Sequence, residues 1–273
     1  MIINTSIAIS TSNVLLVPYQ EHHVPTYHEW MKDEDIREAT ASEQLTLEKE
    51  YGMQRSWRND ADKLTFITCL PKNDSSLSSR SKDDEKSQSI SAKKDDSPDR
   101  MVGDVNLFIS EHEEELDEEA DAGVSTQTDQ HFRAIGELEL MIASKAHQGT
   151  GLGRASLLAF LRYVVDNQEG ILAEFSASVD SSRKVKVPKQ FEYLRVKIHQ
   201  SNDRSIGLFE SIGLEKISEE PNYFGELELR LQLGDGNEQQ SGEKVATVKD
   251  KVDMLMRKYG VEGFRELKYV DGL

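Results

Sequence analysis

The spacing of hydrophobic positions divides the chain into short strands and amphipathic helices. Residues 64–70 form an apolar run of strand length, whereas residues 101–109 alternate between apolar and polar positions with a period of two. Between 152 and 165, Leu157, Leu158 and Leu161 fall on one helical face. The same criteria predict strands at 14–17, 64–70, 101–109, 136–143, 191–199, 214–217 and 226–231, and helices at 24–31, 46–57, 152–165 and 204–211.

Polar segments interrupt this pattern. Residues 71–100 carry too few apolar side chains to offset the entropy cost of ordering them, and 111–135 begin with a block of like charges. Together with 178–190, these segments are predicted to be disordered insertions in one domain that spans 14–233. Residues 234–243 have the composition of a linker, and 244–273 are predicted to form a C-terminal helical tail that docks on the domain.

The composition excludes several classes of protein. The 273 residues include 33 Lys or Arg and 50 Asp or Glu, which gives a net charge of -17. Nucleic-acid binding usually needs a basic surface, so we expect no nucleic-acid partner. The chain has no run of about 20 apolar residues and no signal-peptide pattern at its N-terminus. We therefore expect a cytoplasmic protein, with the nucleus as an alternative, that does not bind membranes.

Cysteine and histidine give no pattern typical of a metal site. Cys69 is the single cysteine, and its strand-like neighbours indicate an inert core thiol. The adjacent His22 and His23 are expected to point in different directions from a helix or strand. No carboxylate stands nearby at a ligand spacing, so no metal is predicted.

A glycine-rich turn lies between the strand predicted at 136–143 and the long helix that follows. Such a turn presents free backbone N–H groups at the positive end of the helix dipole, which suits a phosphate. Its spacing fits neither the P-loop, which needs Gly-Lys-Ser/Thr, nor the dinucleotide motif G-x-G-x-x-G. The spacing that fits is Gln/Arg-x-x-Gly-x-Gly/Ala, met by Gln148, Gly151 and Gly153.

This spacing resembles the pyrophosphate-binding signature of the GNAT superfamily of acetyl-CoA-dependent N-acetyltransferases. Downstream, Asn202, Ser205, Phe209 and Gly213 are similar to the segment after the fifth strand of these enzymes. Several long blocks between residues 17 and 108 are similar to the N-acetyltransferase 9-like branch. The resemblance covers the predicted domain outside its insertions.

The resemblance implies an α/β (α+β) fold with a mixed, mostly antiparallel, V-splayed sheet of about six to seven strands flanked by helices. Acetyl-CoA is expected to lie in the splay, with its pantetheine arm along one strand and its pyrophosphate on the glycine-rich turn. The implied contacts are Met141, Ile142, Ala143, Gln148, Gly149, Thr150, Gly151, Leu152, Gly153, Arg154, Asn202, Ser205 and Phe209. For Arg154, a phosphate contact and a solvated helix position both stay open.

Acetyl transfer to an amine needs a base for the amine proton and a donor for the developing oxyanion. Glu137 and Glu139 share one face of the predicted strand, where they are either candidate bases or solvated carboxylates. By its distance from Gln148, Glu137 matches the catalytic glutamate of some lysine acetyltransferases in this superfamily. His199, at a strand end, is a candidate proton relay or a structural residue. A backbone N–H at Ile142 or Ala143 is the expected oxyanion donor.

The proton donor for the leaving thiolate departs from the superfamily pattern. Many GNAT enzymes have a Tyr where this chain has Phe209, and Phe cannot donate a proton. Ser205, Tyr223 and water remain candidates, and the thiol of coenzyme A is acidic enough to leave without a dedicated acid.

We therefore expect an acetyl-CoA-dependent N-acetyltransferase acting on an amine of a protein or peptide, either a Lys side chain or an N-terminus. The acidity of the chain favours an amine in a basic peptide. Two alternatives stay open: a catalytically degenerate acyl-CoA-binding or scaffold protein of this fold, and an acetyltransferase for small-molecule amines.

Overall fold

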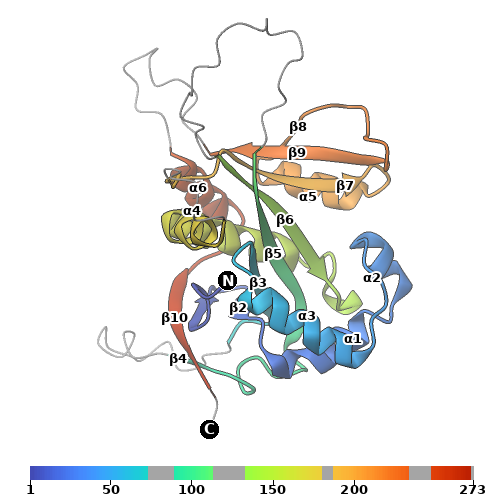
Figure 1. The fold of residues 1–273 in the computed structure, drawn as a ribbon, viewed down its shortest axis with the longest axis vertical. Helices are drawn as coiled ribbons and strands as arrows, with labels where there is room; N and C mark the ends of the chain where they lie inside the picture. Colours follow the sequence, from blue (N-terminus) through green and yellow to red (C-terminus); the bar gives the residue numbers. More distant parts are fainter. Residues whose placement is uncertain (73–88, 113–132, 180–186, 234–246, 272–273) are drawn as a thin grey trace, which may run out of the picture.

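One mixed sheet organises the molecule. The computed structural model describes residues 1–72, 89–112, 133–179, 187–233 and 247–271. In these ranges ten strands pair in the order β4-β10-β1-β2-β3-β5-β6-β7-β9-β8 (Figure 1). Neighbours are antiparallel except the pairs β10–β4 and β6–β7. The expected mixed, mostly antiparallel sheet with flanking helices is confirmed, but it has more strands than the six to seven predicted.

The strands match the predicted ones and add three: one near each end of the chain and one within the predicted insertion 71–100. They are β1 (Ile7–Ser10), β2 (Leu15–Pro18), β3 (Lys63–Cys69), β4 (Ser89–Ser91), β5 (Met101–Glu111), β6 (Ala134–Ile142), β7 (Tyr193–His199), β8 (Glu215–Lys216), β9 (Glu226–Gln232) and β10 (Arg265–Val270). The additional strands β1, β4 and β10 form one edge of the sheet.

The helices include one that the sequence pattern did not predict, α2. They are α1 (Val24–Trp30), α2 (Glu34–Ala39), α3 (Leu47–Asn59), α4 (Leu152–Ser178), α5 (Asp203–Ser211) and α6 (Val248–Lys258). Side chains cap several N-termini: Thr46 accepts from the backbone N–H of Lys49, and Asn202 accepts from that of Ser205. No helix in the described ranges is both long and apolar enough to cross a lipid bilayer.

Two hydrophobic cores lie on opposite faces of the sheet. Helix α4 packs on β1, β5 and β6, and the ring of Phe66 meets those of Phe160 and Tyr163 edge-on, with centroids 6.0 and 5.4 Å apart. The second core joins Tyr19, Tyr27 and other residues of the α1–α3 side to the strands. Burying apolar side chains on both faces is the main force that holds these layers together.

Residues 89–100 are structured, which corrects the expectation of disorder for this part of the insertion 71–100. Strand β4 pairs with β10, and the guanidinium of Arg100 donates to the carbonyl oxygens of Asp95, Leu70 and Pro71. Strand β10 and the carbonyl groups of Leu70 and Pro71 are distant in sequence from this segment, so its local composition does not reveal these contacts. Residues 73–88, 113–132, 180–186 and 234–246, which include most of the rest of the predicted insertions, the whole predicted linker and the start of the predicted tail, lie outside the described residues.

The C-terminal segment contributes to the sheet as well as to a helical layer. Helix α6 buries Val252 and Met256 against the α4 side, and Lys249 forms an ion pair with Asp166 of α4 at 2.6 Å. Strand β10 then inserts between β1 and β4, so a strand of the C-terminal segment lies beside a strand of the N-terminal segment (Figure 1). The tail is thus an integral layer and edge of the fold, rather than a helix alone.

Candidate functional site

A cleft opens where β6 and β7 separate. The two parallel strands pair only at Gly136 with Leu194 and at Glu137 with Arg195, although β6 continues to Ile142. The open end of this V contains a cleft of about 830 Å³. Its lining comes from the end of β6, the turn before α4, the first turns of α4 and α5, and helix α2.

The turn after β6 has the backbone geometry of an anion cradle. Gly149 and Gly151 have φ values of 76° and 93°, in the left-handed region that favours glycine. Gly151 is the N-cap of α4, and the helix begins its backbone hydrogen bonding with Ala155 N–H to the Gly151 carbonyl at 3.0 Å. The preceding amide groups of α4 therefore have no helical acceptor and point toward the helix N-terminus, where an anion is favoured.

Gly153 lets α4 approach the strand. A Cβ atom at this position would lie 3.2 Å from Leu140 Cδ2 and 3.6 Å from Ile142 Cγ1. A larger side chain would push the first turn of α4 away from β6 and displace the cradle.

Gln148 ties the cradle to both arms of the V. Its Nε2 donates to the carbonyl oxygen of Ile142 at 2.8 Å, at the end of β6. Its Oε1 accepts from Nη1 of Arg204 at 3.2 Å, in the first turn of α5. Gln148 therefore fixes the turn through its side chain, in addition to any backbone contact it makes with a ligand.

Basic side chains line the cleft in a chain whose net charge is -17. They are Lys145, His147 and Arg204, together with the predicted Arg154; Asp35 and Asp203 line it as well, and Lys145 is ion-paired with Asp33 at 2.7 Å. Sequence reasoning missed the first three, although Arg204 lies two residues beyond the predicted Asn202. It also missed the α2 side of the lining, because so short a helix carries little periodic signal; that side consists of Asp35, Ile36, Ala39 and Thr40.

Most of the predicted acetyl-CoA contacts do line this cleft. They are Met141, Ile142, Gln148, Gly149, Thr150, Gly151, Gly153, Arg154, Asn202 and Ser205. Three predicted contacts do not. Phe209 is buried in the hydrophobic core, Leu152 packs against that same core, and Ala143 belongs to the core on the opposite face. Phe209 lies one turn beyond Ser205 on nearly the same side of α5, and this further turn places its ring in the core, where it is 4% exposed.

The two candidate glutamates have different surroundings. Glu137 accepts a hydrogen bond from Arg195 Nε at 2.8 Å and lies 3.7 Å from Lys197 Nζ. The side chain of Glu139 reaches solvent, yet the surrounding protein desolvates it enough that, with the nearby Asp104 and Glu137 charges, its pKa rises to about 7. Glu139 is therefore the carboxylate of the pair that exchanges protons near neutral pH.

A buried carboxyl lies diagonally across from Glu139. Asp104 pairs with Met141 and Asn106 pairs with Glu139, so both acids share one face of β5 and β6. Asp104 accepts from Tyr27 Oη at 3.3 Å and from Asn106 Nδ2 at 3.1 Å. Desolvation nevertheless raises its pKa to about 6. Two titratable carboxyls, Glu139 of β6 and Asp104 of the neighbouring β5, thus lie close to the end of β6 that lines the cleft.

His199 lies away from the cleft lining, at the end of β7. Its Nδ1 is 2.7 Å from Ser201 Oγ, and its ring lies against Gly225 in the loop before β9. Tyr223, a candidate thiolate donor, is 97% exposed in the same loop. Ser205, His199 and Tyr223 were the candidate side chains for donating or relaying a proton. Of these three, Ser205 alone lines the cleft.

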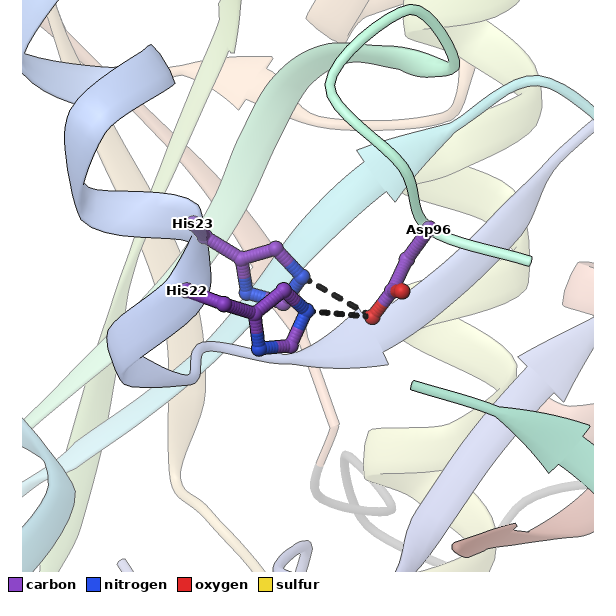
Figure 2. Close-up of side chains that lie close together, drawn as sticks. All are labelled: His22, His23 and Asp96. Atoms are coloured by element: carbon purple, nitrogen blue, oxygen red, sulfur yellow. Dashed lines mark hydrogen bonds and ion pairs between the residues drawn. The ribbon is translucent and has the colours of Figure 1, made fainter. Parts of the chain in front are cut away.

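His22, His23 and Asp96 form a separate cluster (Figure 2). The Nε2 atoms of the two histidines lie 3.1 and 2.9 Å from Asp96 Oδ2, and Tyr269 Oη donates to the same oxygen. The expectation that the two histidines point in different directions is therefore wrong. Both belong to the 3-10 helix η1 (Glu21–His23), and Asp96, from the unpredicted structured segment, draws both rings to one carboxylate.

Hydrogen bonding assigns the proton of His23 and opposes a metal at this cluster. Nδ1 of His23 accepts the backbone N–H of Gln20 at 3.0 Å, so the ring is neutral and carries its proton on Nε2. That nitrogen donates to Asp96 and has no lone pair for a metal ion. Burial favours a raised pKa for Asp96, but the hydrogen bonds from His22, His23 and Tyr269 hold it well below its usual range. The cluster links η1, β10 and the segment 89–100.

Comparison with known proteins identifies the family of the chain. The profile of the acetyltransferase (GNAT) domain matches residues 13–215. An acetyltransferase of the GNAT family from Bacillus anthracis has a crystal structure that aligns with 82% of this chain and 98% of its own, with a TM-score of 0.49 and 11% identity.

Two relatives match over nearly their whole length. The N-acetyltransferase 9-like protein of Schizosaccharomyces pombe is 38% identical over 237 residues, which is 85% of this chain and 98% of that protein. The alpha/beta-tubulin-N-acetyltransferase 9 of Homo sapiens is 35% identical over 252 residues, 92% of this chain and 95% of that protein. The chain therefore belongs to the GNAT acetyltransferase family, in its N-acetyltransferase 9-like branch, and is an acetyltransferase of the GNAT type.

Proposed function

We propose that this chain transfers an acetyl group directly from acetyl-CoA to an amine of a protein. The observation that carries the proposal is the cleft between β6 and β7 with its phosphate cradle, together with Glu139 of β6, a carboxylate of raised pKa that is not itself among the residues lining the cleft. Neither feature alone implies acetyl transfer, but the family membership supports reading them together.

The cradle and its basic neighbours suit the polyanionic part of acetyl-CoA. Backbone N–H groups at the start of α4 would bind the pyrophosphate, with Arg154 and Arg204 adding positive charge around it. The exposed edge of β6 near Met141 and Ile142 would pair with the pantetheine arm, since β7 has already separated there. Acetyl-CoA would supply the thioester, and every other group in the reaction belongs to the protein or the amine.

Glu139 is the general base of this proposal. With a pKa of about 7 it is about half ionised at neutral pH, which is the favourable range for accepting a proton from an ammonium group, directly or through water. Glu137 is less suitable, because its ion pairs with Arg195 and Lys197 occupy the carboxylate.

The reaction balances without a covalent enzyme intermediate. The ammonium group loses one proton to Glu139, the nitrogen of the resulting amine forms a bond to the acetyl carbon, and the carbon–sulfur bond breaks to release the thiolate. The second proton leaves the same nitrogen and passes to the thiolate through Ser205, which lines the cleft, or through water. Cys69 is no nucleophile, since burial in the core raises the pKa of its thiol far above neutral.

The substrate class rests on the relatives. Two of them, from Drosophila melanogaster and Homo sapiens, are called alpha/beta-tubulin-N-acetyltransferase 9 and are 36% and 35% identical to this chain. We therefore take a protein amine as the substrate and α/β-tubulin as the first acceptor to test. The choice between a Lys side chain and an N-terminus, and the basic character of the acceptor, remain predictions.

Isotope-labelled acetyl-CoA tests the proposal. The full chain is incubated with labelled acetyl-CoA and either α/β-tubulin or a proteome-derived peptide library, and the products are mapped by mass spectrometry. We expect labelled amines that disappear when acetyl-CoA is omitted. If the protein binds coenzyme A but labels no amine, the scaffold alternative is correct. If it labels small amines alone, the small-molecule alternative is correct.

A further inference from the structure

The C-terminal segment reaches the rim of the acetyl-CoA cleft through one aromatic residue. The guanidinium carbon of Arg154 lies 4.2 Å from the ring centroid of Tyr259, which follows α6 as its C-cap. Arg154 lines the cleft from the first turn of α4. Tyr259 lies well beyond residue 215, where the match to the acetyltransferase (GNAT) domain ends.

Ser211 completes the contact from a third segment. Its Oγ accepts a hydrogen bond from Arg154 Nε at 3.1 Å, and its carbonyl oxygen accepts one from Tyr259 Oη at 3.2 Å. The start of α4, the end of α5 and the C-cap of α6 therefore meet at the guanidinium group of Arg154. Such a contact restricts both the position and the plane of the guanidinium.

This arrangement leaves the Nη groups of Arg154 for a ligand. A guanidinium has five N–H donors, of which Nε–H is used by Ser211 and the ring of Tyr259 covers one face. In the part of the chain that the structure describes, the Nη groups have no hydrogen-bond acceptor. They belong to a side chain that lines a cleft with a glycine cradle and with Lys145 and Arg204. A phosphate oxygen is the acceptor that suits this setting.

We infer that Tyr259 is a positioning residue for the phosphates of acetyl-CoA: it holds the Arg154 guanidinium with its Nη groups directed to the cleft. The inference rests on the proposed function, because it takes acetyl-CoA as the ligand. It also resolves the open choice for Arg154, which becomes a phosphate contact. The C-terminal segment then contributes to cofactor affinity, in addition to extending the sheet.

The docking of α6 does not depend on Tyr259 alone, so the role can be tested in a folded protein. Val252 and Met256 are buried against the core, and ion pairs join Arg162 to Asp253 and Lys249 to Asp166. Tyr259→Leu should therefore leave the tail in place while removing the aromatic face. Tyr259→Phe keeps the ring and loses only the hydroxyl.

The test is calorimetric titration of coenzyme A into the full chain and its variants. We expect Tyr259→Leu to weaken binding about fivefold, and Tyr259→Phe to bind like the wild type within about twofold. In a background of Arg154→Gln, the further change Tyr259→Leu should have no additional effect. Kinetically, the KM for acetyl-CoA should rise with kcat unchanged, and the KM for S-acetylpantetheine, which lacks the phosphates, should not change.

Three outcomes would overturn the inference. They are equal binding by Tyr259→Leu and wild type, an undiminished effect of Tyr259→Leu in the Arg154→Gln background, and an equal loss with S-acetylpantetheine. Near-ultraviolet circular dichroism and the melting temperature verify that α6 stays docked in each variant. If the wild type itself binds no coenzyme A, the proposed function fails, and this result is distinct from a failure of the role of Tyr259.

Discussion

Arg204 donates a hydrogen bond to the side-chain oxygen of Gln148 at 3.2 Å, and this bond bridges the two arms of the splayed sheet. Gln148 follows β6 and is bonded to the carbonyl of Ile142, whereas Arg204 lies in α5 after β7. The strands themselves pair only as far as Glu137 and Arg195, so the open end of the V has this side-chain contact across it. The position of the cradle thus depends on a residue outside the glycine-rich motif.

Replacing Arg204 tests this bridge. We expect Arg204→Ala to weaken coenzyme A binding about tenfold, because it removes both the tie to Gln148 and a positive charge lining the cleft. The dependence of binding on salt concentration should also decrease, because one charge is lost. Titrations at two ionic strengths measure both effects. An unchanged dissociation constant would show that the bridge has no part in binding.

The pH dependence of the reaction tests the base. Glu139 acts as a base only when deprotonated, and its pKa is about 7. The value of kcat/KM should therefore increase with pH through an apparent pKa near 7 and then level off. Rates measured over a range of pH with a fixed protein acceptor provide the profile. A profile without an inflection in this range would argue against Glu139.

Substitution separates the two glutamates of β6. Glu139→Gln should lower kcat by about 100-fold or more and remove the inflection, since the amide cannot accept the proton. Glu137→Gln should have a smaller effect, because Glu137 is held in ion pairs with Arg195 and Lys197. Assays of both variants at saturating substrate decide between them. A larger loss for Glu137→Gln would assign the base to that residue.

Substitution of Gly151 tests the cradle, and substitution of Gly52 is the matched control. With φ at 93°, an alanine there is strained, so Gly151→Ala should lower the free energy of unfolding by about 1–2 kcal/mol and weaken coenzyme A binding. Gly52 lies within α3, and a Cβ atom there meets no atom within 4 Å. Gly52→Ala should therefore raise the free energy of unfolding by about 0.5–1 kcal/mol and leave binding unchanged. Urea unfolding and calorimetry compare the two, and similar results for both would contradict the assignment.

The cluster around Asp96 predicts a pH-dependent stability. Burial lowers the pKa of His23, so its contribution is present above the unfolded-state pKa of about 6.5 and is lost as the pH falls below it. Asp96 has a depressed pKa, so its contribution is lost at still lower pH, below about 4. The contribution of this cluster to the free energy of unfolding should therefore decrease in two stages between pH 7 and pH 3, while the raised pKa values of Asp104 and Glu139 act in the opposite direction. Unfolding in urea at a series of pH values measures this.

Tyr269→Phe isolates one donor of this cluster. The variant keeps the ring that packs in the core and removes the hydroxyl that donates to Asp96. We expect the free energy of unfolding to decrease by about 1.5–3 kcal/mol at pH 7, the usual range for a hydrogen bond to a charged group. Unchanged stability would show that the two histidines alone satisfy Asp96.

The sequence predicted those elements whose signal is local. The alternation in 101–109, the apolar run at 64–70 and the helical stripe after Gly151 all appear as predicted elements, and the glycine cradle lies at their junction. Strands β4 and β10 were missed because β10 is stabilised by pairing with β4 on one side and β1 on the other, and β4 by pairing with β10. Such pairing depends on contacts between residues that are far apart in sequence.

The residues of the site also divide into those with a local sequence signal and those whose role depends on distant parts of the chain. The glycines were found because a turn requires glycine at particular positions, whereas Asn202 was found through the resemblance to the segment after the fifth strand of GNAT enzymes. Arg204 and α2 were missed because their roles follow from where the splay places them. Phe209 was assigned to the cofactor by resemblance, and the structure places it in the core. The environments of Glu137 and Glu139 likewise depend on the neighbouring strands β5 and β7. The sequence of β6 alone does not contain this information.

The most direct test of acetyl transfer at this cleft compares the wild type with Glu139→Gln in one experiment. Coenzyme A binding is measured by calorimetry, and labelled acetyl transfer to the panel of protein amines is measured by mass spectrometry. We expect both proteins to bind coenzyme A equally. The wild type should transfer the acetyl group, and the rate of acetyl transfer by Glu139→Gln should be about 100-fold lower. Binding without transfer by the wild type, or equal transfer by both proteins, would contradict this expectation.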